Sequence, residues 1–305
     1  MRFRSFLSKV KPSVSNIACF VEKYNFTDPR EEGALQKFKL AAEKQGSEFH
    51  FLFREDISEV PKYDAVFIRA TTDPLNTAYV VSKTAWELGL KVIDDPESIT
   101  ICGNKIHQYL LFEKYNVPSI PTMFLNKDEL HHKKISDIFD ALGKPVVIKA
   151  PYTSFSRYVE KAACETNFRD VAKRFFKKSD VLAIQKFTPT AFDWRVGVLN
   201  NDILYVCKYM IPKGKWKHGA KLRGKPTVIW GRTVSMKRQK MPVRLREVAL
   251  KACSVVGKGL YGVDIKEVDG KYVVVEVNDN PSIYAGYEDS MDHDIYQRII
   301  SYLSD

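Results

Sequence analysis

Apolar strands alternate with amphipathic helices along the first hundred residues of the chain. The apolar, β-branched and aromatic runs that predict strands lie at 15–23, 48–53, 64–70 and 91–95. The helical patterns between them lie at 30–46 and 76–89, and each ends at a glycine. Strands that alternate with helices of this length predict a parallel sheet with helices on its faces. No G-x-G-x-x-G motif follows the first strand, so we expect no dinucleotide site there.

The pattern changes after Gly103, where hairpins replace the strand–helix alternation. An amphipathic helix at 103–118 is followed by a strand at 120–125 and by a helix that ends near Gly143. The further strand patterns lie at 144–151 and 181–187, and the further helical patterns at 242–258 and 291–303. The two predicted hairpins cover 193–211, turning at Asn200–Asn201, and 261–277, turning at Asp269–Gly270. Strands, helices and hairpins in this order predict an α/β protein with α+β C-terminal lobes.

The composition is that of a soluble globular protein, with 45% hydrophobic and 28% charged residues. No apolar run approaches the ~20 residues that span a bilayer. The 5 cysteines are scattered and form no CxxC pair, which favours a reducing, cytoplasmic compartment and argues against a disulfide framework or a zinc site. Residues 1–16 are basic and serine-rich, which fits either a targeting or membrane-touching arm or a solvated lead-in to the first strand.

Positive charge is concentrated in one part of the chain. The net charge is +11, yet the segment 203–246 holds thirteen Lys or Arg residues and no acid, and the rest of the chain is close to neutral. An acidic partner for this segment is therefore expected, whether phosphates, an acidic peptide or nucleic acid.

The segment VVVEVNDNPS, residues 273–282, sets one carboxylate among valines. An isolated charge in such a strand is costly unless something positive lies against it. Strand alternation puts Glu276, Asn278 and Asn280 on one face, and three oxygen-bearing side chains could bind a hard cation such as Mg²⁺. The alternative is a strand that ends in an Asx-Pro turn, with Glu276 paired to a Lys or Arg.

Other apolar strands also carry single charges, at Lys149, Lys208 and Asp264. Each alone is more often an edge-strand residue or one whose stem is buried and whose charge reaches solvent. Together with Glu276 they combine cations with carboxylates, which is what a Mg²⁺–nucleotide site requires.

The order of these features resembles the ATP-grasp superfamily, in particular the RimK-type ligases and glutathione synthetase. Four segments carry the resemblance: the lysine-bearing helix and the strand after it in CGNKIHQYLLFEKYNVPSIPTMFL, the segment VLAIQKF, and the ending GVDIKEVDGKYVVVEVNDNPS. The resemblance implies an N-terminal parallel-sheet (pre-ATP-grasp) domain at 1–100, a central ATP-grasp lobe at 101–187, and a C-terminal lobe with the metal site at 188–305.

The resemblance also implies roles for individual residues. It assigns Lys105 and Lys149 to the ATP phosphates and Asp193 to the nucleotide sugar. It assigns Gln185, Lys186 and Phe187 to the linker that takes adenine, where the backbone of 186 and 187 would bond the base and Phe187 would pack nearby. It assigns Arg195 to a substrate or phosphate pocket, Lys208 to the triphosphate, and Lys217 and His218, beside Trp216, to the nucleotide and acceptor. Asp264, Glu276 and Asn278 would hold two Mg²⁺ ions, or Mn²⁺, with Glu276 bridging them.

Two departures from the family pattern concern the nucleotide site. The family's phosphate-covering lid is rich in glycine, whereas APYTSFSRYVEKA has none, so Ser154 and Ser156 would supply the donors. The acidic residue of the family's Q-E-Y segment is replaced by Lys186, which leaves only a backbone contact to adenine at this position.

The activity that the resemblance implies is an ATP-dependent carboxylate–amine ligase that works through an acylphosphate. Its partners would be ATP, an amine and an acidic substrate, glutamate-like or phosphorylated, because the cations of 213–225 exceed what phosphate contacts need. Three alternatives stay open: a solvated basic loop with no partner, a non-catalytic ATP-binding module, and a nucleic-acid-binding protein that uses 203–246. No membrane contact is expected, and a homo-oligomer is compatible with the sequence.

Metal binding places a demand on the second hairpin. A two-residue turn would pair Asp264 with Val275 and put Asp264 and Glu276 on opposite faces. We therefore predict a three-residue loop, 269–271, with a bulge and with Gly270 at positive φ.

Overall fold

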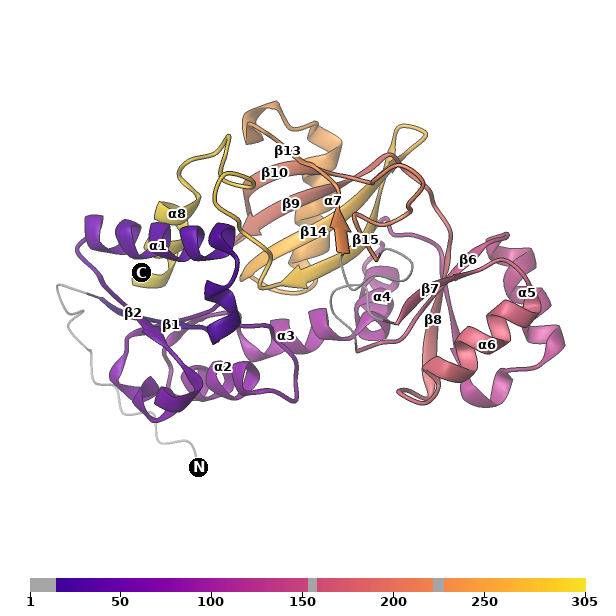
Figure 1. Ribbon diagram of the computed structural model, residues 1–305, viewed down its shortest axis with the longest axis horizontal. Helices are drawn as coiled ribbons and strands as arrows, with labels where there is room; N and C mark the ends of the chain where they lie inside the picture. Colours follow the sequence, from indigo (N-terminus) through magenta and orange to yellow (C-terminus); the bar gives the residue numbers. More distant parts are fainter. Residues whose placement is uncertain (1–14, 153–157, 222–227) are drawn as a thin grey trace.

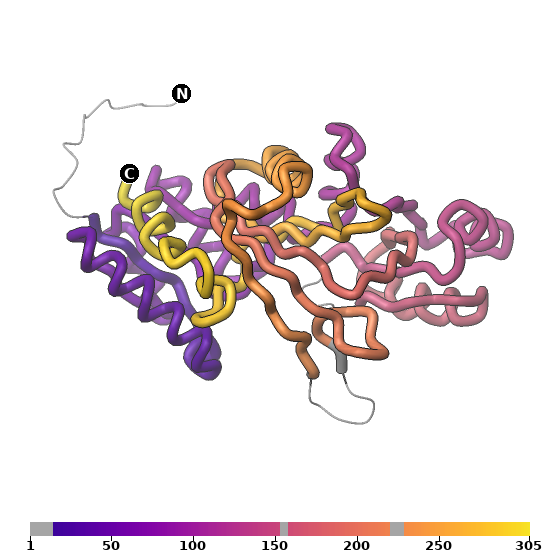
Figure 2. Tube along the Cα trace, turned by 90° about the horizontal axis from the view of Figure 1, so that it is seen from above, coloured from indigo at the N-terminus to yellow at the C-terminus, as the bar shows by residue number. Residues whose placement is uncertain are grey.

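Three of the four sheets formed by the described residues follow one another along the long axis of the molecule (Figure 1). The computed structural model describes residues 15–152, 158–221 and 228–305. In the view of Figure 2, the N-terminal sheet lies at one end, the five-stranded sheet lies in the middle, and the central lobe, which holds the four-stranded antiparallel sheet, lies at the other end. Ser154 and Ser156, the expected donors of the lid, lie outside the described residues.

The N-terminal sheet is parallel throughout, as predicted, with the strand order β2-β1-β3-β4. Its strands are β1 (Asn16–Phe20), β2 (Glu48–Leu52), β3 (Ala65–Ile68) and β4 (Lys91–Ile93). Helix α1 (Pro29–Lys44) begins where Asp28 accepts a hydrogen bond from the Arg30 backbone amide and Pro29 occupies the first turn. It covers one face of the sheet, and helix α2 (Thr77–Glu87) covers the other.

Helix α8 (Ile295–Ser304) returns from the far end of the chain to this first sheet, beside α1 (Figures 1 and 2). Ile299 and Leu303 are buried in the same hydrophobic cluster as Phe38 and Phe67. The rings of Phe38 and Tyr296 meet edge to face, with centroids 4.8 Å apart. The predicted helix at 291–303 thus exists, but it begins four residues later.

The central lobe is a four-stranded antiparallel sheet of order β5-β8-β6-β7. Its strands are β5 (Thr122–Asn126), β6 (Val146–Lys149), β7 (Val159–Ala162) and β8 (Val181–Lys186). Helices α5 (His132–Leu142) and α6 (Glu165–Phe175) pack on it through a hydrophobic cluster of their own.

The middle sheet has five antiparallel strands in the order β13-β10-β9-β14-β15. Its strands are β9 (Phe192–Leu199), β10 (Asp202–Met210), β13 (Thr233–Met236), β14 (Leu260–Val268) and β15 (Lys271–Asp279). One face is buried against α3 (Pro96–Gly103), α4 (Lys105–Lys114) and α7 (Val243–Ser254). The short remaining elements are the ribbon of β11 (Gly219–Lys221) and β12 (Val228–Trp230) and the 3-10 helices η1 (Lys23–Phe26), η2 (Arg54–Lys62), η3 (Lys127–Glu129) and η4 (Arg238–Lys240). A parallel sheet followed by antiparallel lobes is the predicted fold class.

The first hairpin of this sheet turns where the sequence predicts. Asn200 and Asn201 have φ of 49° and 61°, the left-handed conformation that a two-residue hairpin turn requires and that asparagine adopts readily.

The second hairpin corrects the predicted loop. Val268 pairs with Lys271, so the turn has two residues, Asp269 and Gly270, rather than three. Gly270 is at positive φ, as predicted. The register then shifts between Asp264 and Ile265, because Ile265 faces Val274 while Asp264 faces Glu276. The predicted bulge therefore exists, but it lies within the strands at Val275, where it restores the facing of the two carboxylates.

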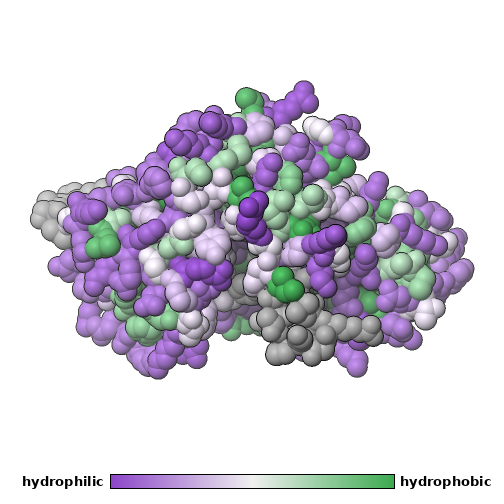
Figure 3. Space-filling view, turned by 45° about the horizontal axis from the view of Figure 1, so that its top comes forward, coloured by the Kyte–Doolittle hydropathy of each residue, from purple (hydrophilic) through white to green (hydrophobic). Residues whose placement is uncertain are grey.

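The surface is mainly hydrophilic on the face that Figure 3 shows, and its apolar residues lie scattered or in small groups. No helix of the described residues is long and apolar enough to cross a membrane.

Candidate nucleotide and metal site

Two acidic and two basic side chains share the face of the middle sheet that α7 leaves uncovered. Asp193 and Arg195 alternate along β9, and Asp264 and Lys266 alternate along β14, where Asp264 is paired with Arg195. The Lys266 ammonium donates to Asp193 Oδ1 at 2.5 Å. Asp193, expected at the nucleotide sugar, is thus held by an ion pair on the site face.

Arg195 contacts both oxygens of Asp264. Its Nε lies 2.8 Å from Oδ1, and its Nη2 donates to Oδ2 at 3.1 Å. Burial raises the pKa of Asp264 to about 6 although Arg195 lowers it. Burial would lower the pKa of Arg195, but the charge of Asp264 outweighs it and raises that pKa. The two residues therefore support each other as charged groups inside the sheet.

Asn278 lies beside Asp264 with its donor atoms already bonded. Its Nδ2 donates to Asp264 Oδ2 and to the Gly262 carbonyl, each at 3.2 Å. The other end of the amide, Oδ1, is therefore the atom available as a ligand. Asn280, expected on the same face, instead bonds Arg69 and the Ala70 carbonyl, so it lies outside the site.

Glu276 is surrounded by positive charge. The Lys105 ammonium, at the start of α4, lies 3.9 Å from its Oε2. Burial would raise the pKa of Glu276, but the charges of Lys105, Lys149, Arg195 and Lys217 outweigh it and lower the pKa. Burial lowers the pKa of Lys105 and of Lys149. Four cations around one carboxylate leave the site with a surplus of positive charge, as a phosphate-binding site requires.

Helix α4 fastens Glu276 and Lys149 together through two residues that sequence reasoning missed. Gln108 exchanges two hydrogen bonds with the backbone of Val277, at 2.8 Å and 2.7 Å. The Tyr109 hydroxyl accepts from Lys149 Nζ and donates to the Val275 carbonyl, both at 3.0 Å. Polar side chains on the buried face of a predicted helix were the available signal.

The connection between the lobes carries the residues expected at adenine. Gln185 is buried and donates to Thr122 Oγ1 at 2.9 Å. The Lys186 amide donates to the Pro121 carbonyl at 3.0 Å, so of its backbone groups only the carbonyl, which accepts from Thr188 Oγ1 at 3.3 Å, has a lone pair for a ligand. Phe187 meets Trp216 edge to face at 5.9 Å. Of the expected backbone contacts between Lys186 and adenine, only one through the carbonyl is therefore possible.

Lys217 reaches from the middle sheet to the central lobe, whereas His218 packs back on β10 of the middle sheet. Lys217 Nζ donates to the Val159 carbonyl of β7 at 2.6 Å, and burial first, then Lys149, lowers its pKa to about 8. The His218 ring stacks on Tyr209 with centroids 4.5 Å apart, and burial lowers its pKa. The glycines and prolines of 208–226 predict one long loop; residues 211–218 form a loop, but 208–210 belong to β10 and 219–221 to β11.

Lys208 lies on the other face of the sheet, so its predicted role at the triphosphate is wrong. It pairs with Trp194 across β9 and β10, and cross-strand partners share a face. Its ammonium lies 4.2 Å from the centre of the Phe192 ring and 4.7 Å from that of Trp194. The neighbouring residues of the strand, Cys207 and Tyr209, are the ones that share the face of Arg195.

The oxygen donors fit a hard divalent cation. Asp264 and Glu276 face each other, and Asn278 Oδ1 adds a neutral oxygen. The described residues hold no group of three or more His, Cys, Asp or Glu side chains suited to a metal, so the candidate set depends on the amide as its third member.

The sequence profile of the RimK-like ATP-grasp domain matches residues 103–303. The chain belongs to the RimK-like ATP-grasp family. It is accordingly an ATP-dependent carboxylate–amine ligase, an enzyme of a family that uses ATP with divalent metal ions. The resemblance carried by the four sequence segments is thereby confirmed.

Curated relatives of this ATP-grasp ligase are amino-acid ligases. The α-aminoadipate–LysW ligase LysX of Saccharolobus solfataricus is 28% identical over 215 residues, which cover 68% of this chain and 72% of that protein. The glutamate–LysW ligase ArgX of Sulfolobus acidocaldarius is 23% identical over 254 residues, or 79% of this chain and 82% of that protein.

Solved structures show the same fold at low identity. The D-cycloserine synthetase DcsG has a TM-score of 0.73 and 13% identity, and covers 95% of this chain and 98% of its own. The D-alanine–D-alanine ligase of Bacillus anthracis in complex with ATP has a TM-score of 0.68 and 14% identity, with 96% of each chain covered. These likenesses establish the ATP-grasp fold.

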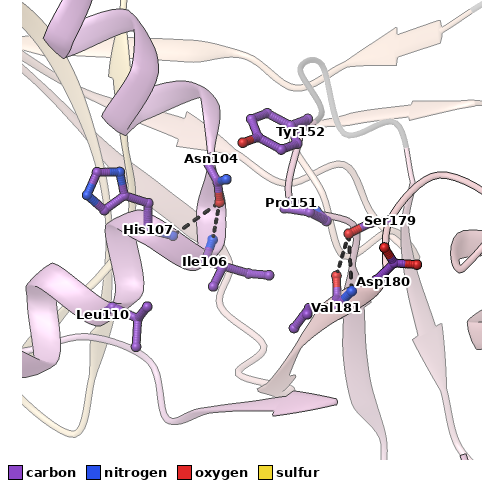
Figure 4. Close-up of a pocket in the computed structure, with 9 residues that line it drawn as sticks. All are labelled: Asn104, Ile106, His107, Leu110, Pro151, Tyr152, Ser179, Asp180 and Val181. Atoms are coloured by element: carbon purple, nitrogen blue, oxygen red, sulfur yellow. Dashed lines mark hydrogen bonds between the residues drawn. The ribbon is translucent and has the colours of Figure 1, made fainter. Parts of the chain in front are cut away.

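A separate pocket of about 440 Å³ lies on the outer side of α4 (Figure 4). Its lining includes Asn104, His107 and Leu110 from α4, and Ser179 and Asp180 from the turn before β8. The Asn104 side chain is bonded to the backbone amides of α4 rather than directed into the pocket. Among the described residues, none of the predicted site residues of this ligase lines that pocket.

Gly262 is a further residue that sequence reasoning did not assign. A Cβ at this position would lie 2.5 Å from Arg195 Nη1 and 2.7 Å from Pro281 Cβ. The glycine therefore leaves the space that Arg195 occupies beside Asp264. The G-x-D spacing of residues 262–264 was the available signal.

Proposed function

We propose that this ligase uses ATP to activate the carboxylate of an acidic substrate and joins it to an amine. The observation that carries the proposal is the convergence of Lys105, Lys149, Arg195 and Lys217 on Glu276, next to a set of oxygen donors. A surplus of buried cations suits a triphosphate and a carboxylate together, because both ligands are anionic.

The names of the relatives support the substrate class. LysX and ArgX are named for α-aminoadipate and glutamate, which are both acidic amino acids, and for LysW. We therefore place a glutamate-like amino acid among the substrates of this chain. The phosphorylated alternative suits the same cations.

The chemical steps need no protein nucleophile. A carboxylate oxygen of the substrate attacks the γ-phosphorus of ATP, and the bond from that phosphorus to the bridging oxygen breaks, which releases ADP. The amine nitrogen then attacks the acyl carbon, inorganic phosphate leaves, and the nitrogen loses a proton. The chain contributes alignment of the reactants, neutralisation of charge and exclusion of water.

We assign ligand contacts to individual residues from their positions in the site. Lys105, Lys149 and Lys217 would hold phosphates, and Arg195 would hold the substrate carboxylate or the transferred phosphoryl group. The Lys186 carbonyl and the Phe187 backbone would meet adenine, with Gln185 behind them, while Asp193 would lie near the sugar and His218 near the acceptor.

Asp264, Glu276 and Asn278 would hold the divalent metal, Mg²⁺ or Mn²⁺, with two ions bridged by Glu276. The metal would neutralise charge on the phosphate oxygens. All 5 cysteines are free, and we propose that the enzyme works in a reducing, cytoplasmic compartment.

Release of ADP tests the proposal. The protein is incubated with ATP, Mg²⁺ and single amino acids, and ADP is measured with and without a second amino acid as the amine. Release that depends on an acidic amino acid supports the ligase, with Glu276→Gln as the inactive control. Tight ATP binding without turnover would support the non-catalytic module instead. A salt-dependent shift with RNA or DNA in the absence of any ATP binding would support the nucleic-acid reading.

A further inference from the structure

Arg69 is a buried cation that the proposed roles do not use. It directly follows β3, at the carboxyl end of the N-terminal sheet, and its side chain and backbone are 5% exposed. Its Nη1 donates to Asn280 Oδ1 at 2.6 Å and to the Pro281 carbonyl at 3.0 Å. Its backbone amide donates to the Phe20 carbonyl, and its carbonyl accepts from Asn25. The guanidinium is thus fixed in place from both ends.

No carboxylate of a described residue forms an ion pair with Arg69. Its guanidinium bonds only neutral oxygens among those residues, and its remaining ring contact is with Phe67 at 5.5 Å. The charge of Arg69 lowers the pKa of the buried acid Asp94, but burial first and Asp279 next outweigh it and raise that pKa well above its usual range, which favours the neutral form of Asp94. A buried positive charge that forms no ion pair is costly, and an anionic ligand would compensate it.

The free donors of Arg69 border accessible space. Its Nε and Nη2 have no hydrogen-bond partner among the described residues, and neither atom is fully enclosed by the protein. Two donors of one planar guanidinium, side by side and unoccupied, match the two oxygens of a carboxylate.

A single residue, Pro281, lies between Arg69 and Arg195 in the structure. Pro281, whose carbonyl accepts from Arg69, also lies next to Arg195, because its Cβ and Arg195 Nη1 approach the same point above Gly262, at 2.7 Å and 2.5 Å. The Tyr205 hydroxyl donates to the neighbouring Ser282 carbonyl at 3.2 Å. The two arginines therefore flank the start of the segment that follows β15.

We propose that Arg69 binds the side-chain carboxylate of the acidic substrate, while the α-carboxylate is the one activated, and so sets the preference for an acid over its side-chain amide. The proposal rests on the proposed ligase function. It assigns Arg69 to the substrate rather than to ATP, since Lys105, Lys149 and Lys217 already gather at the opposite side, between α4 and the central lobe.

The test compares L-glutamate with L-glutamine as substrate in the ADP-release assay. Wild-type enzyme should prefer glutamate. Arg69→Gln should raise KM for glutamate about tenfold to a hundredfold, with KM for ATP within about twofold, because a charge-assisted bidentate contact is lost. Arg54→Gln, an exposed arginine of the same N-terminal region, is the matched control and should change neither constant.

A second variant keeps the packing and changes only the charge. Asn280→Asp places a carboxylate where Arg69 already bonds, at a positive φ of 41° that aspartate tolerates. It should raise KM for glutamate and reduce the preference over glutamine, even if Arg69→Gln fails to fold. Unchanged glutamate preference in Asn280→Asp overturns the proposal. An equal rise in KM for ATP also overturns it, because Arg69 would then serve the phosphates.

The outcomes separate this inference from the ligase function. If no amino acid stimulates ADP release, the proposed function fails. If a neutral amino acid is ligated while glutamate and glutamine are not distinguished, the ligase stands and the assignment of Arg69 fails.

Discussion

Arg195 holds both carboxylate oxygens of Asp264, at 2.8 Å and 3.1 Å, inside the candidate metal site. A divalent ion at Asp264 must therefore share this carboxylate with the guanidinium or displace it. The pair also holds the site together without a ligand, because each charge is buried and is compensated by the other.

Breaking this pair should destabilise the protein more than removing it. Asp264→Asn leaves Arg195 buried without a counter-charge and should lower the free energy of unfolding by about 3–5 kcal/mol. The double variant with Arg195→Met should lose less than the sum of the two single losses. Urea denaturation of the four proteins measures the difference. Additive losses would show that the pair is not coupled.

Glu276→Gln should cut turnover by about a thousandfold or more, since neutralisation of phosphate charge by metal ions supplies several kcal/mol. The fold should persist, because Gln108 and Tyr109 still fasten the neighbouring backbone. Asp269→Asn, in the exposed turn of the same hairpin, is the matched control and should retain activity. A Glu276→Gln enzyme with near-normal kcat would show that the metal site is elsewhere.

Lys149→Ala should raise KM for ATP about tenfold to a hundredfold, the effect of losing one charge-assisted contact to phosphate. Metal binding should change little, because Lys149 touches Tyr109 rather than the candidate ligands. Lys173→Ala, on the exposed side of α6, removes the same charge from the same lobe and should leave KM unchanged. Equal effects of the two variants would argue for a diffuse charge effect.

The pKa of Lys217, lowered to about 8, predicts a pH dependence of ATP use. The charged form is the one that holds phosphate, so kcat/KM for ATP should fall as the pH rises through about 8. Lys217→Met should reduce kcat/KM at pH 7 by about tenfold and abolish that fall. A wild-type profile that is flat from about pH 7 to 9 would contradict the role of Lys217.

The exposed cations of the 211–218 loop should act on an acidic substrate at long range. Changing Lys213 and Lys215 to glutamine should raise KM for that substrate about twofold to fivefold at low salt and less at high salt, while KM for ATP moves little. An unchanged KM at low salt would leave these lysines as solvated surface charges.

Local sequence patterns predicted the elements of this protein well, because they depend on neighbouring residues. The alternation of strands and helices predicted the parallel sheet, and Asn200–Asn201 predicted a turn. The placement of Glu276 opposite Asp264 was also predicted, but it was attributed to a three-residue loop, whereas a bulge at Val275 produces it. A bulge can add its extra residue at many points of a strand, and nothing in a run of valines marks Val275 as that residue.

The errors and omissions at the site concern contacts between distant segments. The register between β9 and β10 decides the face of Lys208, and a shift of one residue would reverse it. Arg69, Gly262 and Tyr109 gain their meaning only from partners far along the chain. Single motifs could not reveal those partners.

The packing of α8 on the first sheet has a consequence for the order in which the protein can fold. The face of that sheet beside α1 is completed by residues near position 300, and strands β1 and β3 were synthesised long before them. The N-terminal sheet therefore cannot bury this face during translation until the whole ATP-grasp region has left the ribosome. Among the described residues, the hydrophobic cluster of the central lobe draws on residues 123–184, so this lobe has no such dependence and can fold first.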